Sequence, residues 1–299
     1  MKILVSGSTG LVGSALVPFL STGGHEVVHL VRGRPQPGEA AVPWDPQAGT
    51  IEAAGLEGLD AVVHLAGENI AGRWTAAKKA RIRSSRVAGT RLLAEALAGL
   101  KRPPRTLVCA SAIGYYGDRG DEVLREDSPP GSGFLAEVCR EWEAAARPAA
   151  EKGLRVVHLR IGVVLSPAGG ALARMLTPFK LGLGGRIGAG SQFMSWIAID
   201  DLTGAVHHAL TTESLRGPVN AVAPRPVTNR EFTKTLGRVL GRPTLFPMPA
   251  FAARLAFGEM ADELLLASAR VEPAKLVTSG YRFRAPELEG ALRRLLGKS

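Results

Sequence analysis

The chain has 299 residues, of which 45% are hydrophobic and 21% are charged, and its formal net charge is +10. A chain of this length buries a large core, so it forms one large domain or one domain with a smaller lobe. No apolar run approaches the roughly 18–20 residues of a membrane span, and the first apolar run is too short for a signal peptide. We therefore expect a cytoplasmic protein with no membrane partner.

The positive charge favours either a polyanionic partner or a small ligand that carries phosphates. The basic residues gather in one cluster, KKARIRSSR at 78–86, while aromatic residues make up 5% of the chain. Because surfaces for single-stranded nucleic acid interleave basic and aromatic side chains, this composition disfavours nucleic acid as a partner. The two cysteines, Cys109 and Cys139, have no metal-ligand spacing, so we expect reduced structural thiols and no metal site.

Strand and helix patterns alternate over the first 165 residues. One helical pattern follows a glycine-rich turn at 7–13, and two more cover 75–100 and 134–153. The expected strands are 2–6, 25–32, 60–67, 105–112 and 155–165. Apolar strands that alternate with helices are typical of a parallel sheet covered on both faces. The sequence therefore predicts an α/β fold with a doubly wound parallel Rossmann sheet.

The alternation ends near residue 165, where a different organisation begins. We expect residues 1–165 to form a dinucleotide-binding Rossmann domain and residues 166–299 to form mainly a smaller lobe on the substrate side. Elements at approximately 195–224 are expected to return to the sheet. A C-terminal domain is expected at approximately 245–295, with a helix over 249–271. Asp200 or Asp201 is expected to cap the start of a helix, because a carboxylate accepts hydrogen bonds from free N–H groups there.

The turn GSTGLVG (7–13) joins the first strand to the first helix and has the pattern of a phosphate-binding loop. Gly7 permits the tight turn, Gly10 lets the backbone approach a pyrophosphate, and Gly13 lets the helix pack close to the sheet. Free N–H groups at the start of the helix then face the anion, helped by the helix dipole. The expected cofactor-binding residues of this turn are Gly7, Thr9, Gly10, Leu11, Val12 and Gly13.

The end of the second strand indicates which dinucleotide is bound. An NAD site usually has Asp or Glu there to bind the ribose 2′-hydroxyl. This chain reads HLVRGRP, with Arg32 and Arg34 and no acid. A guanidinium forms charged hydrogen bonds with a 2′-phosphate, so the sequence favours NADP, with Arg32 as a cofactor-binding residue. The alternative is a pair of solvated surface arginines, which does not explain the missing acid.

Further motifs in fixed order extend the pattern over almost the whole chain. With the glycine turn, they make the chain resemble the extended short-chain dehydrogenase/reductases (SDRs). The resemblance is closer to an atypical branch, the epimerase family or sugar nucleotide epimerase-like proteins, which have their own C-terminal domain. The motifs that carry it are HLAGENI (64–70), RIRSSRVAGTR (81–91), SAIGYYG (111–117), FLAEVCREWEAAA (134–146), PFKLGLGGRIGAGSQFMSWIAIDDL (178–202) and NAVAPRPVTNREF (220–232).

The resemblance implies further positions near the cofactor. Arg81 and Arg86 are expected to reach its phosphates, with a solvated basic helix face as the alternative. Val164 is expected to pack against the nicotinamide, and Ser111 occupies the position of the catalytic serine beside the cofactor. The remaining cofactor-binding residues implied by the family lie at the end of the third strand, His64, Leu65, Ala66 and Gly67.

One feature of the extended family is missing. Its members have a YxxxK motif, in which a tyrosine exchanges a proton with the substrate oxygen and a lysine lowers the pKa of that tyrosine. In this chain Phe134 stands where the tyrosine is expected, and Val138 stands where the lysine is expected. Tyr115 or Tyr116 is left open as a substitute acid, as is Glu68.

Two functions therefore remain. The first is an NADP(H)-binding, atypical SDR-type oxidoreductase or epimerase-like protein that acts on an unknown small molecule. The alternative is a catalytically inactive NADP-binding redox sensor or regulatory protein, which acts through a protein partner or as a homodimer. A nucleic-acid binder built on the same fold ranks last.

Overall fold

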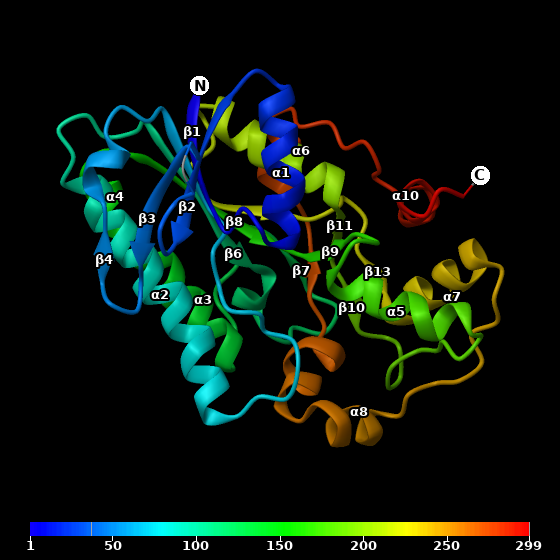
Figure 1. Cartoon of the computed structure of the whole chain (residues 1–299). Coiled ribbons are helices and arrows are strands. Elements are labelled where there is room, and N and C mark those ends of the chain that lie inside the picture. The colour runs from blue at the N-terminus through cyan, green and yellow to red at the C-terminus, as the bar shows by residue number, and fades with distance from the viewer. Residues whose placement is uncertain (37, 299) are drawn as a thin grey trace.

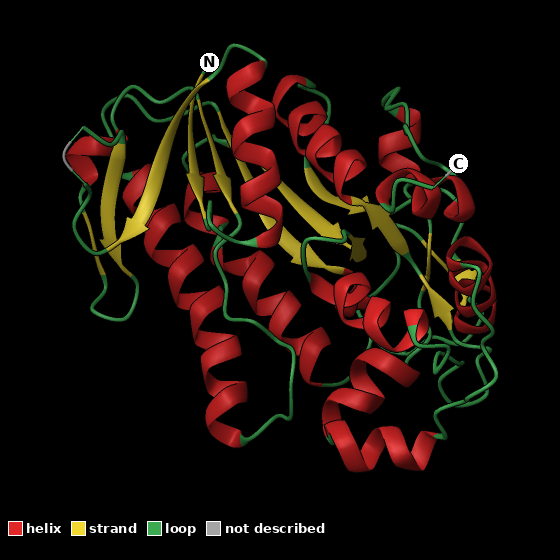
Figure 2. Ribbon diagram, turned by 45° about the vertical axis from the view of Figure 1, so that its right-hand side comes forward, coloured by secondary structure: helices red, strands yellow, loops and turns green. Residues whose placement is uncertain are grey.

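A computed structural model describes residues 1–36 and 38–298. Within these residues the central sheet has eight strands in the order β12-β8-β6-β5-β1-β2-β3-β4 (Figures 1 and 2). All neighbours in this sheet are parallel except β3 and β4. The strands are β1 (Lys2–Ser6), β2 (Glu26–Arg32), β3 (Ala41–Asp45), β4 (Thr50–Ile51), β5 (Ala61–His64), β6 (Thr106–Ala112), β8 (Arg155–Ile161) and β12 (Gly217–Ala221). The prediction of a doubly wound Rossmann sheet is confirmed.

Strand order reverses between β1 and β5. The chain first moves outward from β1 through β2 to β3, and it then returns to place β5 on the other side of β1. In open α/β sheets, ligands bind outside the carboxyl ends of the strands at such a reversal. The ends of β1 and β5 therefore mark the position of the site.

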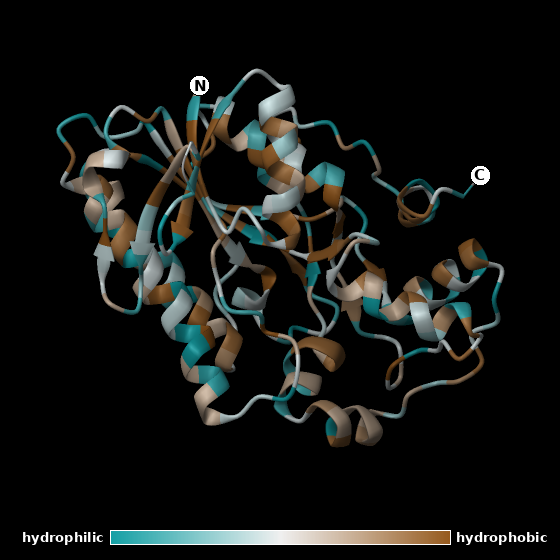
Figure 3. Cartoon of the chain, in the orientation of Figure 1, coloured by the Kyte–Doolittle hydropathy of each residue, from teal (hydrophilic) through white to brown (hydrophobic). Residues whose placement is uncertain are grey.

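Helices cover both faces of the sheet. One face carries α1 (Leu11–Thr22) and α6 (Ile199–Thr211), and the other carries α2 (Ala76–Ala98), α3 (Phe134–Ala145) and α4 (Arg147–Glu151). The strands at the centre are mainly apolar, as Figure 3 shows in brown. Burial of these residues on both sides supplies the main driving force for the fold. No helix within the described residues is long and apolar enough to cross a membrane.

Two expected elements are interrupted. The helical pattern at 134–153 breaks at Ala146, because Pro148 fits only the first turn of a new helix. The strand pattern at 155–165 breaks at Gly162, and β9 (Val163–Leu165) leaves the main sheet. A Cβ atom at Gly162 would lie 2.6 Å from the carbonyl oxygen of Ser195, so only glycine permits this crossing.

A smaller lobe beside the sheet contains three helices and two short sheets of two strands each, among the residues described. Its core surrounds the buried Trp196 and Phe232. In Figure 1 its helices α5 and α7 lie to the right of the main sheet. The elements are α5 (Gly170–Lys180), α7 (Asn229–Leu240), α10 (Leu288–Leu295), β9 with β11 (Trp196–Ala198), and β10 (Phe193–Met194) with β13 (Val227–Thr228).

The expected helix cap at Asp200 or Asp201 is wrong. Helix α6 starts at Ile199, so its N-cap position is Ala198, two residues before Asp200, and no side chain of the described residues caps it. Asp201 is buried instead, and its carboxylate accepts hydrogen bonds from the backbone N–H groups of Arg284 and Ala285. This carboxylate therefore binds the C-terminal segment to α6.

The C-terminal segment returns across the carboxyl edge of the sheet. The helix expected over 249–271 is split, because the chain turns at Gly258, which has a positive φ of 61°. The carboxylate of Glu263 accepts hydrogen bonds from the N–H groups of Phe134 and Leu135 and so caps α3. The elements of the C-terminal segment are α8 (Ala250–Phe257), η3 (Ala261–Leu266), β14 (Arg270–Val271) and α9 (Ala274–Thr278). Three short elements of the described residues remain. Two of them follow β6 in the chain, η2 (Ile113–Tyr116) and β7 (Val123–Leu124), and the third, η1 (Ala53–Leu56), precedes β5.

A buried ion pair fixes α3 to the sheet. Arg160 on β8 donates from Nε and Nη2 to the two carboxylate oxygens of Glu143 on α3, at 2.8 and 2.9 Å. The side chains of Arg160 and Glu143 are only 3% and 14% exposed. Burial disfavours the charge of Arg160, but the bonds to Glu143 outweigh this effect and raise its pKa. Arg160 therefore stays positively charged where it is buried between β8 and α3.

We expect Glu143→Ala to lower the free energy of unfolding by about 3–5 kcal/mol, because it leaves the charge of Arg160 buried without a partner. Glu141→Ala is the matched control on the same helix. Glu141 is exposed and pairs with Arg83 at 3.3 Å, so its loss costs about 0–1 kcal/mol. Urea unfolding of both variants measures the difference, and equal midpoints would contradict the role of the pair.

Candidate functional site

The glycine turn packs directly against the end of β5. Gly7 has a positive φ of 67°, and a Cβ atom there would lie 3.0 Å from the backbone nitrogen of Ala66. A Cβ atom on Gly13 would lie 2.6 Å from the Cα atom of Ser8 and nearer still to the Gly7 oxygen. Both positions therefore require glycine, and α1 starts closer to the sheet than any larger residue permits.

The start of α1 is open to an anion. Its N-cap residue is Gly10, and no side chain within residues 1–36 and 38–298 caps it. The N–H groups of the first turn lack partners inside the helix and point out of its N-terminus. Thr9 is exposed, and Leu11 and Val12 are partly buried, so the backbone of this turn faces the carboxyl edge of the sheet. The turn thus has the geometry of a pyrophosphate site.

Two arginines follow the end of β2, which is the neighbour of β1. Arg32 and Arg34 are both exposed, and no carboxylate of the described residues lies within the 4.0 Å that defines an ion pair. Since β1 and β2 are parallel, Arg32 and the glycine turn lie at the same edge of the sheet. The edge therefore offers a free guanidinium beside the phosphate-binding turn.

His64 holds the ends of β1 and β5 together. The hydroxyl oxygen of Ser6 accepts hydrogen bonds from the N–H groups of Leu65 and Ala66, at 3.0 and 3.2 Å. Its hydrogen is therefore left for Nδ1 of His64, 2.7 Å away. The ring of His64 is fully buried, and this burial lowers its pKa to about 4. The expected cofactor position at His64 thus has a buried, neutral side chain that supports the backbone of the site.

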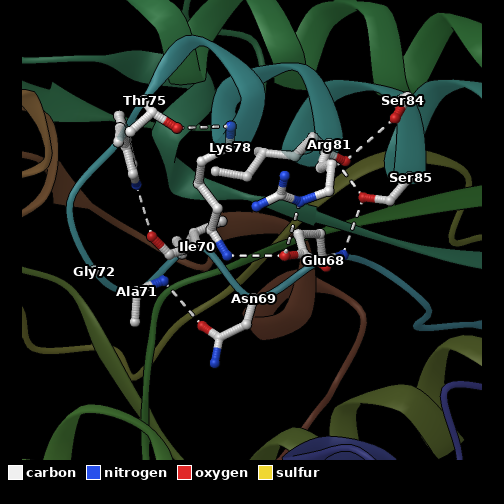
Figure 4. Close-up of polar contacts among 12 residues, drawn as sticks. Glu68, Asn69, Ile70, Ala71, Gly72, Thr75, Lys78, Arg81, Ser84 and Ser85 are labelled. Atoms are coloured by element: carbon white, nitrogen blue, oxygen red, sulfur yellow. Dashed lines mark hydrogen bonds and ion pairs between the residues drawn. The ribbon is translucent and has the colours of Figure 1, made fainter.

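The loop after β5 is held by charged side chains from the start of α2 (Figure 4). Figure 4 shows Lys78 and Arg81 turned toward Glu68, at Nζ to Oε1 and Nε to Oε1 distances of 2.8 and 3.7 Å. The bond from Lys78 is the main cause of a lowered pKa at Glu68. Glu68 is therefore a carboxylate near neutral pH, which disfavours it as the substitute acid.

Arg86 lies directly behind Gly67. Its Nη1 atom donates to the carbonyl oxygen of Glu68 at 3.0 Å, and its guanidinium lies 5.0 Å from the ring centroid of Trp142. A Cβ atom on Gly67 would lie 3.3 Å from Cζ of Arg86. Arg86 thus positions the loop and adds a cation to it, whereas Arg81 is largely exposed and pairs with Glu68.

Ser111 and Val164 lie farther along the edge. The hydroxyl of Ser111 is 3% exposed and donates to Oε1 of Glu143 at 2.8 Å, so its hydrogen already has a partner. Val164 on β9 pairs with Ile197 and is partly buried. The catalytic role of Ser111 stays a prediction, because its hydroxyl must exchange this partner to reach a substrate.

The side chains of α3 that face the end of β6 lie one residue further along the chain than expected. Phe134 and Val138 pack on Trp74 and Ile82, toward α2. The Cβ atom of a residue at position 114 would instead meet Leu135 and Cys139, so these two side chains face the end of β6. They have the four-residue spacing of the YxxxK motif, and burial raises the pKa of Cys139 to about 12. The acid–base pair is absent in either register.

The two tyrosines after β6 have different surroundings. Tyr116 is fully buried, and its hydroxyl bonds with the side chain of Asn220 at 2.7 Å. Burial raises the pKa of Tyr116 to about 12, which is typical of a structural phenol. Tyr115 is partly buried, and its ring centroid lies 3.4 Å from Cζ of Arg160.

The structure brings most of the expected residues to one edge. The glycine turn touches the end of β5, and Ser111 lies on the next strand, β6. Arg32 does not approach Ser111, because three inter-strand steps, or about 14 Å, separate β2 from β6. This spacing suits an elongated ligand that lies across the strand ends. The sequence reasoning missed Glu143, Arg160 and Glu263, whose partners lie far away in the chain.

Comparison with known proteins identifies the family. Residues 3–221 match the NAD dependent epimerase/dehydratase family. The chain belongs to this family. Residues 248–295 match a domain of unknown function, DUF1731. The expected membership of the epimerase branch, with its own C-terminal domain, is therefore confirmed.

Relatives in this epimerase/dehydratase family cover the whole chain. An epimerase family protein of Mycobacterium bovis is 45% identical over 97% of this chain and 96% of its own length. The human epimerase family protein SDR39U1, crystallised with NADPH, has a TM-score of 0.91 and 40% identity over 99% of both chains. A nucleoside-diphosphate sugar epimerase of Corynebacterium glutamicum has a TM-score of 0.82 and 43% identity; the match covers 99% of this chain and 58% of that chain.

The buried His64 predicts a specific pH dependence of stability. Its pKa is about 4 when folded, against 6.5 for the unfolded side chain. Between these values the unfolded chain binds the extra proton, so stability is complete above pH 6.5 and falls by about 3 kcal/mol as the pH drops toward 4. His64→Asn keeps an acceptor for Ser6 but removes the titrating ring. Chemical unfolding across this range should therefore give a flatter profile for the variant.

His29→Asn, the same substitution on the neighbouring β2, is the control for the effect of replacing a histidine by asparagine in the sheet. The other histidines are present in both the wild type and His64→Asn, so their contributions cancel in the comparison. A profile for His64→Asn that parallels the wild type would rule out a neutral, buried His64.

Proposed function

We propose that the chain binds NADPH across the carboxyl edge of its sheet and acts as an atypical oxidoreductase or epimerase-like enzyme. The observation that carries the proposal is the glycine turn, which no described side chain caps, with Arg32 beside it, which pairs with no described carboxylate. The turn is specific, because a side chain at position 7 would meet the backbone of Leu65 and Ala66, and one at position 13 would meet the backbone of the turn itself. The human relative crystallised with NADPH supports the same cofactor.

The preference for NADPH follows from charge. Arg32 and Arg34 place two cations where NAD-binding members of this fold carry an acid. A guanidinium forms two charged hydrogen bonds with a phosphate, whereas NADH offers only neutral hydroxyls at this position. The chain's own residues would hold the pyrophosphate at the glycine turn and the 2′-phosphate at Arg32, and NADPH supplies the hydride.

The residues of α3 leave two candidate functions for the bound cofactor. Leu135 and Cys139 place apolar or neutral groups where an acid–base pair would face the substrate. Loss of such a pair slows proton transfer by about 10²–10⁴-fold unless another group replaces it. The same observation favours the second candidate, an NADP-binding redox sensor that acts through a protein partner or a homodimer. Turnover separates the two, because a sensor binds NADPH without oxidising it in the presence of carbonyl compounds.

Arg32→Asp should weaken NADPH binding by about 100-fold, because it removes two charged hydrogen bonds and adds a repelling carboxylate. The affinity for NADH should change little, since NADH has no 2′-phosphate. Isothermal titration calorimetry with both cofactors measures this difference. Arg91→Asp, an equal charge change on an exposed position of α2, should leave both affinities unchanged. Equal weakening of NADPH and NADH by Arg32→Asp would show that Arg32 does not bind the 2′-phosphate.

A further inference from the structure

Tyr115 lies at the carboxyl edge of the sheet, next to the strands that would border the nicotinamide. It belongs to η2, which directly follows β6. Its ring packs in a cluster with Val222 and Val271, and a Cβ atom on Gly162 would lie 2.8 Å from Cγ1 of that same Val222. Gly162 precedes β9, which carries Val164. Tyr115 therefore lies between the sheet edge and the C-terminal segment.

The hydroxyl of Tyr115 is available for chemistry. The sequence contains three tyrosines. The hydroxyl of Tyr116 bonds with the side chain of Asn220, and the hydroxyl of Tyr281 donates to the backbone oxygen of Asp201. The hydroxyl of Tyr115 makes no hydrogen bond with any residue of the part of the chain that the structure describes. It is thus the phenol free to approach a ligand.

A fixed cation supports the ring of Tyr115. The guanidinium of Arg160 lies 3.4 Å from the ring centroid, held by Glu143 and by the backbone oxygen of Glu126. A cation at this distance is attracted to the face of a phenol and to the negative charge of a phenolate. The stacking also limits the rotation of the ring. Arg160 therefore positions the ring of Tyr115 at the edge of the sheet.

We propose that Tyr115 is the catalytic acid that replaces the absent tyrosine of α3, a role that rests on the proposed NADPH-dependent function. When a carbonyl carbon takes a hydride from C4 of NADPH, its C=O π electrons move to oxygen, and this oxygen needs one proton. Tyr115 gives that proton from Oη, becomes a phenolate and takes up one H⁺ from the solvent, so the net reaction consumes NADPH and one H⁺. The products are an alcohol and NADP⁺. In the reverse direction the phenolate takes the hydroxyl proton of the substrate.

Tyrosine labelled with ¹³C at the ζ-carbon tests the placement of Tyr115 without a substrate. The protein gives three signals, which are assigned by Tyr→Phe variants at 115 and 281 and by elimination. Saturating NADP⁺ should shift the Tyr115 signal, whereas 2′,5′-ADP, which lacks the nicotinamide, should not. The Tyr281 signal should stay in place with both, since Tyr281 packs under α6. A Tyr115 signal that NADP⁺ leaves unmoved would overturn the proposal.

Kinetics test the proton transfer itself. With 4-nitrobenzaldehyde as the carbonyl probe, Tyr115→Phe should lower kcat by about 10²–10⁴-fold and leave KM for NADPH unchanged. The control Tyr281→Phe should keep the wild-type kcat. An unchanged kcat in Tyr115→Phe, or a wild-type protein that does not oxidise NADPH with this probe, would overturn the role of Tyr115. Failure of NADPH to bind in calorimetry would instead reject the proposed function as a whole.

Discussion

The buried pair of Arg160 and Glu143 is the interaction on which the site depends. It joins β8 to α3, and the same carboxylate also accepts the hydrogen bond of Ser111 on β6. The ring of Tyr115, which lies on η2 directly after β6, stacks on the guanidinium of Arg160, so the pair also positions Tyr115. Three elements that bring different groups to the edge are thus fixed by two buried charges. Such a pair sets geometry more than stability, because removing two charges from water costs much of what their attraction returns.

The edge of the sheet has two differently built halves. The half beside β1 and β2 has an uncapped glycine turn and two exposed arginines that form no ion pair with the described residues, which suits phosphates. The half beside β6 and β8 has side chains that bond with one another, such as Ser111 with Glu143 and Tyr116 with Asn220, next to the phenol of Tyr115. The proposed cofactor contacts therefore come from the main chain of the glycine turn and from Arg32, whereas the proposed proton transfer depends on the hydroxyl of Tyr115. This division shows how the chain can keep a nucleotide site without the YxxxK motif on α3.

Much of the fold and half of the site were predictable from sequence. The order of strands and helices follows from local patterns, and the glycine turn is one contiguous motif whose function depends on its own backbone. The register of α3 was not predictable, because its position against Gly114 is set by an ion pair between residues 143 and 160 on different elements. The hairpin of β3 and β4 was missed, since its residues are interrupted by turns. The sequence predicts a helix cap at Asp200 or Asp201, and this prediction is wrong because the partners of Asp201, at 284 and 285, lie far away in the chain and leave no local signal.

Glu263 caps the start of α3 and so joins the C-terminal region to the Rossmann region. Gly133 has a φ of 100°, and a Cβ atom at that position would collide with the carboxylate of Glu263. The acid and the glycine are 130 residues apart by number, and a side chain at position 133 would displace the carboxylate that caps α3. The C-terminal region therefore contributes directly to the start of a helix of the Rossmann region. A chimera that joins these regions from different relatives must keep both positions matched.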